Sequence, residues 1–116
     1  MKIKLSDIVN GVVSINALQE IKLPVKISYR LKRLVDRLTP ILKNYDEQRN
    51  ELIKKLGEKD EEKDTWNVKK ENLTEFYAEL QKVLEIEEDI EWEKIKIDEL
   101  GDVKIEPKLL LDFIFE

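Results

Sequence analysis

Apolar residues recur every three or four positions across the middle of this 116-residue chain, and this spacing constrains the fold more than any other feature. Such spacing is the period of an α-helix with one buried side. Pro24 suits the first turn of this helix, and Gly57 suits its end. A helix of about 32 residues would be roughly 48 Å long, which exceeds the diameter of a domain this size. The apolar positions are Ile27, Leu31, Leu34, Leu38, Ile41, Tyr45, Leu52 and Leu56.

Pro40 lies in the middle of this segment and has two interpretations. In one, Thr39 caps a new helix whose first residue is Pro40. In the other, a single helix continues with a kink, because proline removes one hydrogen bond and clashes with the preceding turn. The apolar spacing is the same on both sides of Pro40, which favours the kinked helix.

Two further helices flank the long one. A short helix is predicted from Ser6 to about Glu20, with a buried face of Ile8, Val12, Ile15 and Leu18. The polar run at 58–68 is interpreted as a solvent-exposed loop that ends in a β-like Trp66–Val68. A third helix at about 70–84 is expected to return antiparallel along the second half of the long helix and form an αα-hairpin.

The pattern changes period after the third helix. Residues 90–97 alternate between apolar and polar side chains, which predicts one bulged strand or two short ones, and 102–107 is another short strand candidate. Met1–Leu5 also alternates and is expected to pair with one of these strands, while Pro107 opens a short helix or an extended tail. The predicted fold is therefore mainly α with a minor β part. It is a single domain, 1–116, with a helical hairpin at about 25–84 and a small β element from both chain ends, about 1–5 and 89–116.

The residues that most often carry catalysis are missing from this chain. It has no histidine and no cysteine, and its three glycines lie far apart, which disfavours a zinc site, thiolate chemistry and a phosphate-binding loop. The acidic cluster at 85–93 is interpreted as a solvated face rather than as a Mg²⁺ or catalytic site. We therefore expect a non-enzymatic protein with no cofactor and no metal. No window approaches 18 apolar residues and the first residues lack a signal-peptide pattern, so a cytoplasmic protein without a membrane span is expected.

Positive charge is concentrated on the first half of the long helix. Seven cations and one acid lie between Ile21 and Lys43, a local charge of +6. Subtracting this from the net charge of −5 leaves −11 on the other residues. On a helical projection, five of the cations fall within a wedge of roughly 80°, and we call them the basic stripe. Its members are Lys22, Lys26, Arg30, Arg33 and Arg37, and Tyr29 lies at its edge.

Cations one helical turn apart repel each other, so an anionic group is expected to offset the basic stripe. Three sources remain open. The first is internal, such as the acidic "EIEEDIEWE" at 85–93. The second is an acidic surface on a partner protein or on a second copy of this chain. The third is a phosphate-bearing ligand such as a small nucleotide, because arginine pairs well with phosphate. Duplex DNA is disfavoured by the negative charge of the other residues. The predicted binding residues are Lys26, Tyr29, Arg30, Arg33 and Arg37.

Several segments resemble a known group of proteins. They are "LPVKISYRLKRLV", then "ILKNYDEQRNELIKKLGEKDEE", and finally "IKIDELGDVKIEPKLLL". In this order they resemble small uncharacterised helical proteins of tailed phages and prophages of Gram-positive bacteria, over most of the chain from Leu23 onward. That group has no established catalytic residues to transfer. The resemblance implies a phage-encoded helical protein that acts by binding in the cytoplasm of the host cell.

Two functions follow as hypotheses. The first is an interaction protein that binds and blocks or sequesters a host factor through the basic stripe, of the anti-defence or host-takeover type. The alternative is an accessory or chaperone protein in virion or tail assembly. Because one short helix and one hairpin arm cannot cover an apolar ridge as long as 27–56, a homodimer or a higher homo-oligomer is also expected.

Overall fold

A computed structural model describes all 116 residues, and its main elements are three α-helices. They are α1 (Leu5–Gln19), α2 (Val25–Leu56) and α3 (Leu73–Leu84). Two small antiparallel sheets accompany them, which confirms a mainly α fold with a minor β part. One sheet pairs β1 (Lys2–Lys4) with β4 (Glu87–Asp89), and the other pairs β2 (Gly57–Asp60) with β3 (Thr65–Val68). Short 3₁₀ turns form at Lys70–Asn72, Ile97–Leu100 and Pro107–Leu109.

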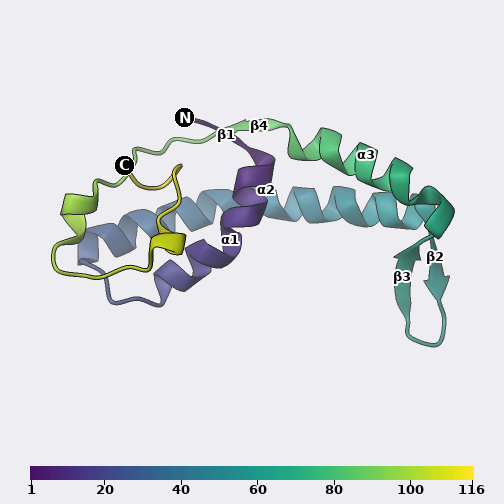
Figure 1. The fold of residues 1–116 in the computed structure, drawn as a ribbon, viewed down its shortest axis with the longest axis horizontal. Coiled ribbons are helices and arrows are strands. Elements are labelled where there is room, and N and C mark those ends of the chain that lie inside the picture. The colour runs from purple at the N-terminus through teal and green to yellow at the C-terminus, as the bar shows by residue number, and fades with distance from the viewer.

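Helix α2 runs nearly the whole length of the molecule, whose longest dimension is 52 Å (Figure 1). It continues through Pro40, so the alternative in which a new helix begins there is wrong. The hydroxyl of Thr39 donates to the carbonyl oxygen of Val35 at 2.8 Å instead of capping a new helix. Pro40 is exposed, as is Asp36, whose carbonyl group loses its helical partner to the proline. Water can therefore satisfy that carbonyl, which keeps the interruption tolerable.

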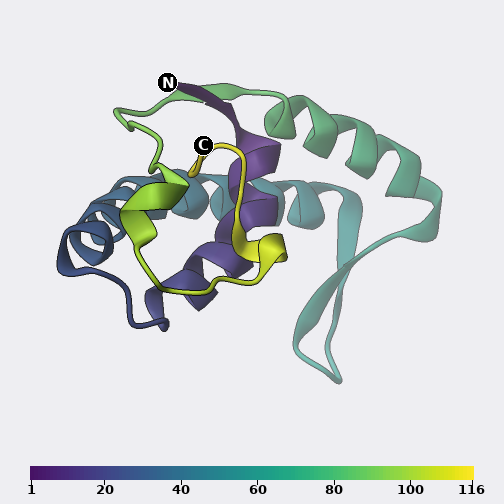
Figure 2. The same ribbon diagram turned by 60° about the vertical axis from the view of Figure 1, so that its left-hand side comes forward.

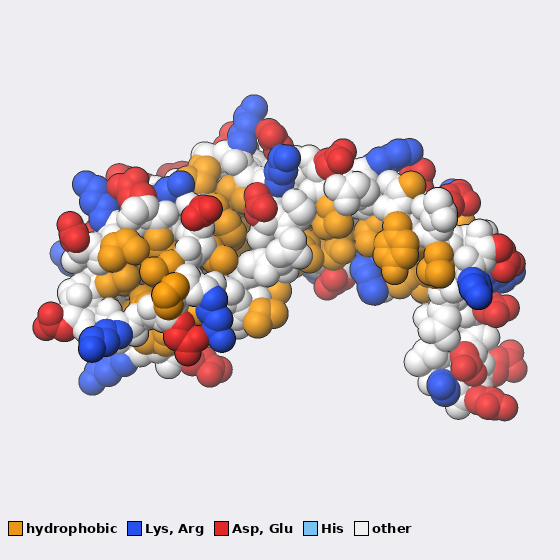
Figure 3. All heavy atoms as spheres, in the orientation of Figure 1, with side chains coloured by type: hydrophobic (Ala, Val, Ile, Leu, Met, Phe, Trp, Pro, Cys, Tyr) orange, Lys and Arg blue, Asp and Glu red, His pale blue; other side chains and the backbone are white.

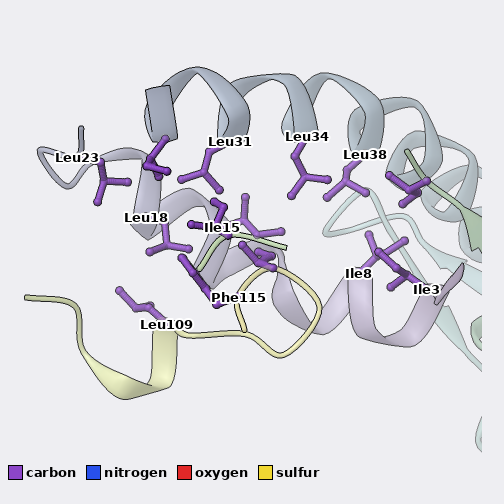
Figure 4. Close-up of a cluster of buried hydrophobic side chains, with 14 of the residues drawn as sticks. Ile3, Ile8, Ile15, Leu18, Leu23, Leu31, Leu34, Leu38, Leu109 and Phe115 are labelled. Atoms are coloured by element: carbon purple, nitrogen blue, oxygen red, sulfur yellow. The ribbon is translucent and has the colours of Figure 1, made fainter. Parts of the chain in front are cut away.

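The core lies around the first half of α2, where α1 packs beneath it. Ile8, Ile15 and Leu18 of α1 are fully buried, while Val12 is only half-buried. Figure 4 shows the buried leucines of α2 pointing toward α1, with Leu109 and Phe115 of the C-terminal segment closing the cluster. The leucines of α2 in this cluster are Leu31, Leu34 and Leu38.

The C-terminal segment covers the side of α1 that carries Gly11. A Cβ atom at Gly11 would lie 3.0 Å from Leu111 and 3.2 Å from Phe113, so the missing side chain lets this segment approach the helix. The segment is held further by a parallel bridge between Ile95 and Phe115. The core therefore has three layers, which are the first half of α2, α1 and the C-terminal segment.

The second half of the molecule is a thin arm, which we define as residues 43–84. Figures 1 and 2 show α3 running back along the second half of α2, with β2 and β3 hanging from the end of this helical hairpin. Only Leu56 and Phe76 are fully buried in the arm. Two helices cannot enclose side chains from all sides, so the remaining apolar side chains stay half-buried or exposed.

The predicted loop is wrong for residues 58–60, which lie in β2, whereas the β-like Trp66–Val68 is confirmed as part of β3. The carboxylate of Asp60 accepts hydrogen bonds from the backbone N–H groups of Glu62 and Lys63, at 3.1 and 3.4 Å. Aspartate side chains often stabilise turns in this way. Asp64 adopts a positive φ of 51°, another conformation that aspartate tolerates. The charged residues therefore form the turn that connects β2 to β3.

Gly57 has a different role from the expected left-handed helix terminator. Its backbone is extended, with φ −116° and ψ −176°, and it begins β2. A Cβ atom here would lie 2.4 Å from the carbonyl oxygen of Ile53 and 2.5 Å from that of Asn67. Glycine is needed at this position because the backbones of α2 and β3 lie too close to its Cα atom to leave room for a Cβ atom.

The chain ends pair as expected, but with a different partner segment. Strand β1 pairs with β4, which ends at Asp89, so 90–97 is not a strand, and 102–107 forms none either. Strand pairing stops because the N-terminal strand has only three residues before α1 begins. Ile90 and Ile95 are nevertheless buried, as their alternation predicted, whereas Ile97 is 45% exposed.

Candidate functional site

Four of the five cations of the basic stripe lie on the first half of α2, whereas Lys22 precedes the helix, which begins at Val25. One edge of the stripe faces the irregular segment 91–99. This segment follows β4 and has no partner strand over most of its length. Its backbone carbonyls therefore need hydrogen-bond donors from elsewhere. Two arginines of the stripe supply them.

Arg30 contacts this segment through three kinds of interaction. One guanidinium nitrogen donates to the carbonyl oxygen of Glu93, and the other donates to the carboxylate of Glu99 at 3.4 Å. The guanidinium carbon also lies 5.2 Å from the ring centroid of Trp92, within the range of a cation–π contact. Trp92 packs against the core cluster, and its buried Nε1 has no hydrogen-bond partner.

Arg37 holds the same segment two turns further along α2. One of its nitrogens donates to the carbonyl oxygen of Glu91, and the other pairs with the carboxylate of the same residue at 3.3 Å. The Arg37 side chain is about a third exposed and that of Glu91 is almost fully exposed, so the ion pair alone contributes only about 0–1 kcal/mol. The hydrogen bonds to backbone carbonyls are the more important function of both arginines.

Between these arginines and the segment lies a groove of about 460 Å³. Arg33 lines it from the middle of the stripe, is exposed, and forms no ion pair. The groove is mixed in charge, because its walls carry two acidic and three arginine side chains. The Glu91 carboxylate pairs with Arg37, whereas Arg30 pairs with Glu99 outside the groove. Its lining residues are Met1, Arg30, Arg33, Leu34, Arg37, Glu91, Trp92 and Glu93.

The five predicted binding residues therefore divide into two sets. Arg30 and Arg37 pair with the chain's own acidic segment, as in the internal alternative. Lys26, Tyr29 and Arg33 are exposed, and neither cation forms an ion pair. We call these three residues the free strip. Sequence reasoning placed all five on one surface, and nothing in the local pattern separates the two sets.

The free strip is a shallow, positively charged surface along about two turns of α2. Lys26 and Arg33 lie seven positions apart, which is about 10 Å along the helix. Tyr29 sits between them and is 62% exposed. Cations at this spacing around an exposed aromatic ring suit several separate carboxylates on another molecule.

Elsewhere the acidic residues do not build a metal site. Nowhere in the structure do three acidic side chains converge on a common point. No helix combines the length and the apolar character needed to cross a bilayer. Comparison of this chain with models of known protein families, with curated proteins and with solved structures finds no match.

Proposed function

We propose that this protein is a non-catalytic interaction protein that binds an acidic surface of a partner protein through the free strip. The observation that carries the proposal is that Lys26 and Arg33 stay unpaired in a chain whose net charge is −5. Acidic residues of the same chain neutralise Arg30 and Arg37 nearby but leave these two cations exposed to solvent. A partner that brings carboxylates to them would remove the repulsion along the helix.

The geometry favours a protein over a small anionic nucleotide. Glu91 and Glu93 form one wall of the groove and would repel a phosphate group that enters it. Only Arg33 offers a free guanidinium there, and the second free cation, Lys26, lies about 10 Å away along the helix. An acidic protein surface can reach both cations without entering the groove.

The resemblance to proteins of tailed phages supports a partner in the host cell. A phage-encoded protein without catalytic residues acts by occupying a surface, so binding would block or sequester the host factor. This is the mode of action expected of anti-defence and host-takeover proteins.

A second candidate function is an accessory role in virion or tail assembly. The observation that favours it is the arm, which projects from the core and keeps apolar side chains such as Trp66 and Tyr77 exposed. Proteins that assemble with others often present such surfaces. The experiment that follows distinguishes the two functions.

The test compares three versions of the protein as bait in lysate from infected host cells. The first is the natural sequence, and the second carries Lys26→Glu and Arg33→Glu. The third carries Lys43→Glu and Arg49→Glu, which make the same change in charge at exposed positions of the same helix. Mass spectrometry identifies the proteins that each bait retains.

We expect a host protein to be retained by the natural sequence and by the control but to be lost from the Lys26/Arg33 variant. Circular dichroism should show that all three versions remain folded, because the exchanged side chains are exposed. Retention of the same host protein by the Lys26/Arg33 variant would refute the free strip as the binding surface. Recovery of virion proteins alone would favour the assembly function.

A further inference from the structure

Helix α3 carries an exposed face without any charge. In a chain in which 41% of residues are charged, five exposed positions of this helix are all uncharged. On a helical projection they occupy an arc of about 140°. We call them the α3 face, and they are Leu73, Thr74, Tyr77, Ala78 and Gln81.

The other sides of α3 are already accounted for. Phe76 is buried on the side that packs against α2. Glu75, Glu79 and Lys82 lie along one flank of the buried side, where Glu79 and Lys82 form an ion pair at 2.9 Å. The α3 face lies on the other flank and has no partner within the chain.

Charges of opposite sign frame the two ends of the α3 face. Lys69, Lys70 and Glu71 precede the helix with a net charge of +1, and Glu85 and Glu87 follow it with a net charge of −2. All five are exposed and none forms an ion pair. The α3 face is therefore neutral in its middle, basic at its start and acidic at its end.

We propose that a second copy of this chain docks on the α3 face, with the two α3 helices antiparallel about a twofold axis. An antiparallel pair brings the lysines of each copy beside the glutamates of the other at both ends. A parallel pair would instead oppose like charges. The neutral middle meets an identical neutral surface, as the symmetry of a C2 dimer requires.

The side chains at the middle of the face suit close helix packing. Ala78 is small and allows the helix axes to approach to the usual 8–10 Å or so. Tyr77 is 62% exposed, and its ring is braced edge-on by the buried Phe76 at a centroid distance of 5.4 Å. Because this neighbour already restricts the ring, less conformational entropy is lost when it packs against a partner. Figure 3 shows that apolar side chains also run along the arm on the face in view.

The size of the α3 face sets the expected affinity. A 12-residue helix is about 18 Å long, and pairing along it buries on the order of 500 Å² per copy. This lies below the roughly 800 Å² per partner of a standard interface. The dimer should therefore dissociate in the micromolar range. This inference does not rest on the proposed function, because the free strip lies on a different helix, in the other half of the molecule.

The first experiment measures the dissociation constant of the dimer by analytical ultracentrifugation. The natural sequence is compared with Tyr77→Glu and Ala78→Glu, which place a charge half-way along the α3 face, the first within its arc and the second at the edge of its arc. The control is Val13→Glu, because Val13 is an apolar side chain that is 75% exposed on α1 and belongs neither to the α3 face nor to the free strip. Circular dichroism checks that each variant keeps its helical content.

We expect the natural sequence and Val13→Glu to dimerise alike, and the two α3 variants to dissociate at least about tenfold more readily. A natural sequence that stays monomeric through the micromolar range would overturn the proposal. So would a dimer that Ala78→Glu leaves unchanged, because that dimer would use another surface.

The second experiment tests the antiparallel orientation by exchanging charges. Lys70→Glu and Glu85→Lys should each weaken the dimer, and the double variant should restore it. Both single changes favour the isolated helix, because an acid near its start and a base near its end interact well with the helix dipole. Weaker dimerisation therefore cannot come from a weaker helix. Single variants that dimerise like the natural sequence would rule out the antiparallel pair.

Discussion

The substitution Leu34→Ala tests where the stability of this protein resides. Leu34 is 1% exposed and belongs to the cluster between α1, α2 and the C-terminal segment. Truncating a buried leucine to alanine costs about 3–5 kcal/mol, which combines the lost burial and the cavity left behind. Total stability for a chain of this length is on the order of 10 kcal/mol. At about 4 °C per kcal/mol, a loss near the lower limit lowers the melting temperature by roughly 12 °C.

The matched control is Leu52→Ala, which makes the same change on the same helix but in the arm. Leu52 is only half-buried, so we expect a cost of about 1 kcal/mol. Both variants are compared with the natural sequence by thermal and urea unfolding at concentrations below the micromolar range of the proposed dimer. A melting temperature lowered as much by Leu52→Ala as by Leu34→Ala would refute the reasoning, because the arm would then have a core of its own.

Three further predictions concern single contacts. Arg30→Ala and Arg37→Ala should each lower the free energy of unfolding by about 1 kcal/mol, because each removes a hydrogen bond to a backbone carbonyl of the segment 91–99. Urea unfolding measures this change. Gly57→Ala should destabilise the β2–β3 hairpin by about 1–3 kcal/mol, because the Cβ atom of the alanine would clash with two backbone oxygens. The lower stability should appear as faster amide hydrogen exchange in β2 and β3. The Lys82 ammonium group donates to Glu79 and lowers the pKa of that carboxyl, so Lys82→Ala should raise this pKa in an NMR titration. Because the folded-state pKa is lowered, the stabilisation is present above the ordinary pKa of a glutamate and is lost as pH falls through the lowered pKa. Lys82→Ala should weaken this pH dependence, because the more distant Lys55 is then the only cation that lowers the pKa.

The helices could be predicted from the sequence because their signal is local. The long helix was expected between Pro24 and Gly57, and α2 spans Val25–Leu56. The short first helix and the helical hairpin formed by α2 and α3 follow the same period of three to four residues. Hydrogen bonds within a helix join residues four positions apart, so a short window of sequence contains the information.

The β parts were predicted less well because strands need partners. The run 90–97 alternates like a strand, yet β4 lies just before it, at Glu87–Asp89. A strand forms only where another segment offers a matching edge, and the short β1 offers three residues. The hairpin at 57–68 was missed because its turn uses Asp60 and Asp64, which also read as part of a charged loop.

The sequence by itself determined the helical architecture and the surface on which the cations lie, because both depend on the period of one helix. Only the tertiary structure decided which of those cations are free. Arg30 and Arg37 have the same charge and nearly the same projection as Arg33, but their partners lie 54 to 69 positions away along the chain. Whether a side chain finds such a partner depends on how distant segments pack, and no local pattern records that.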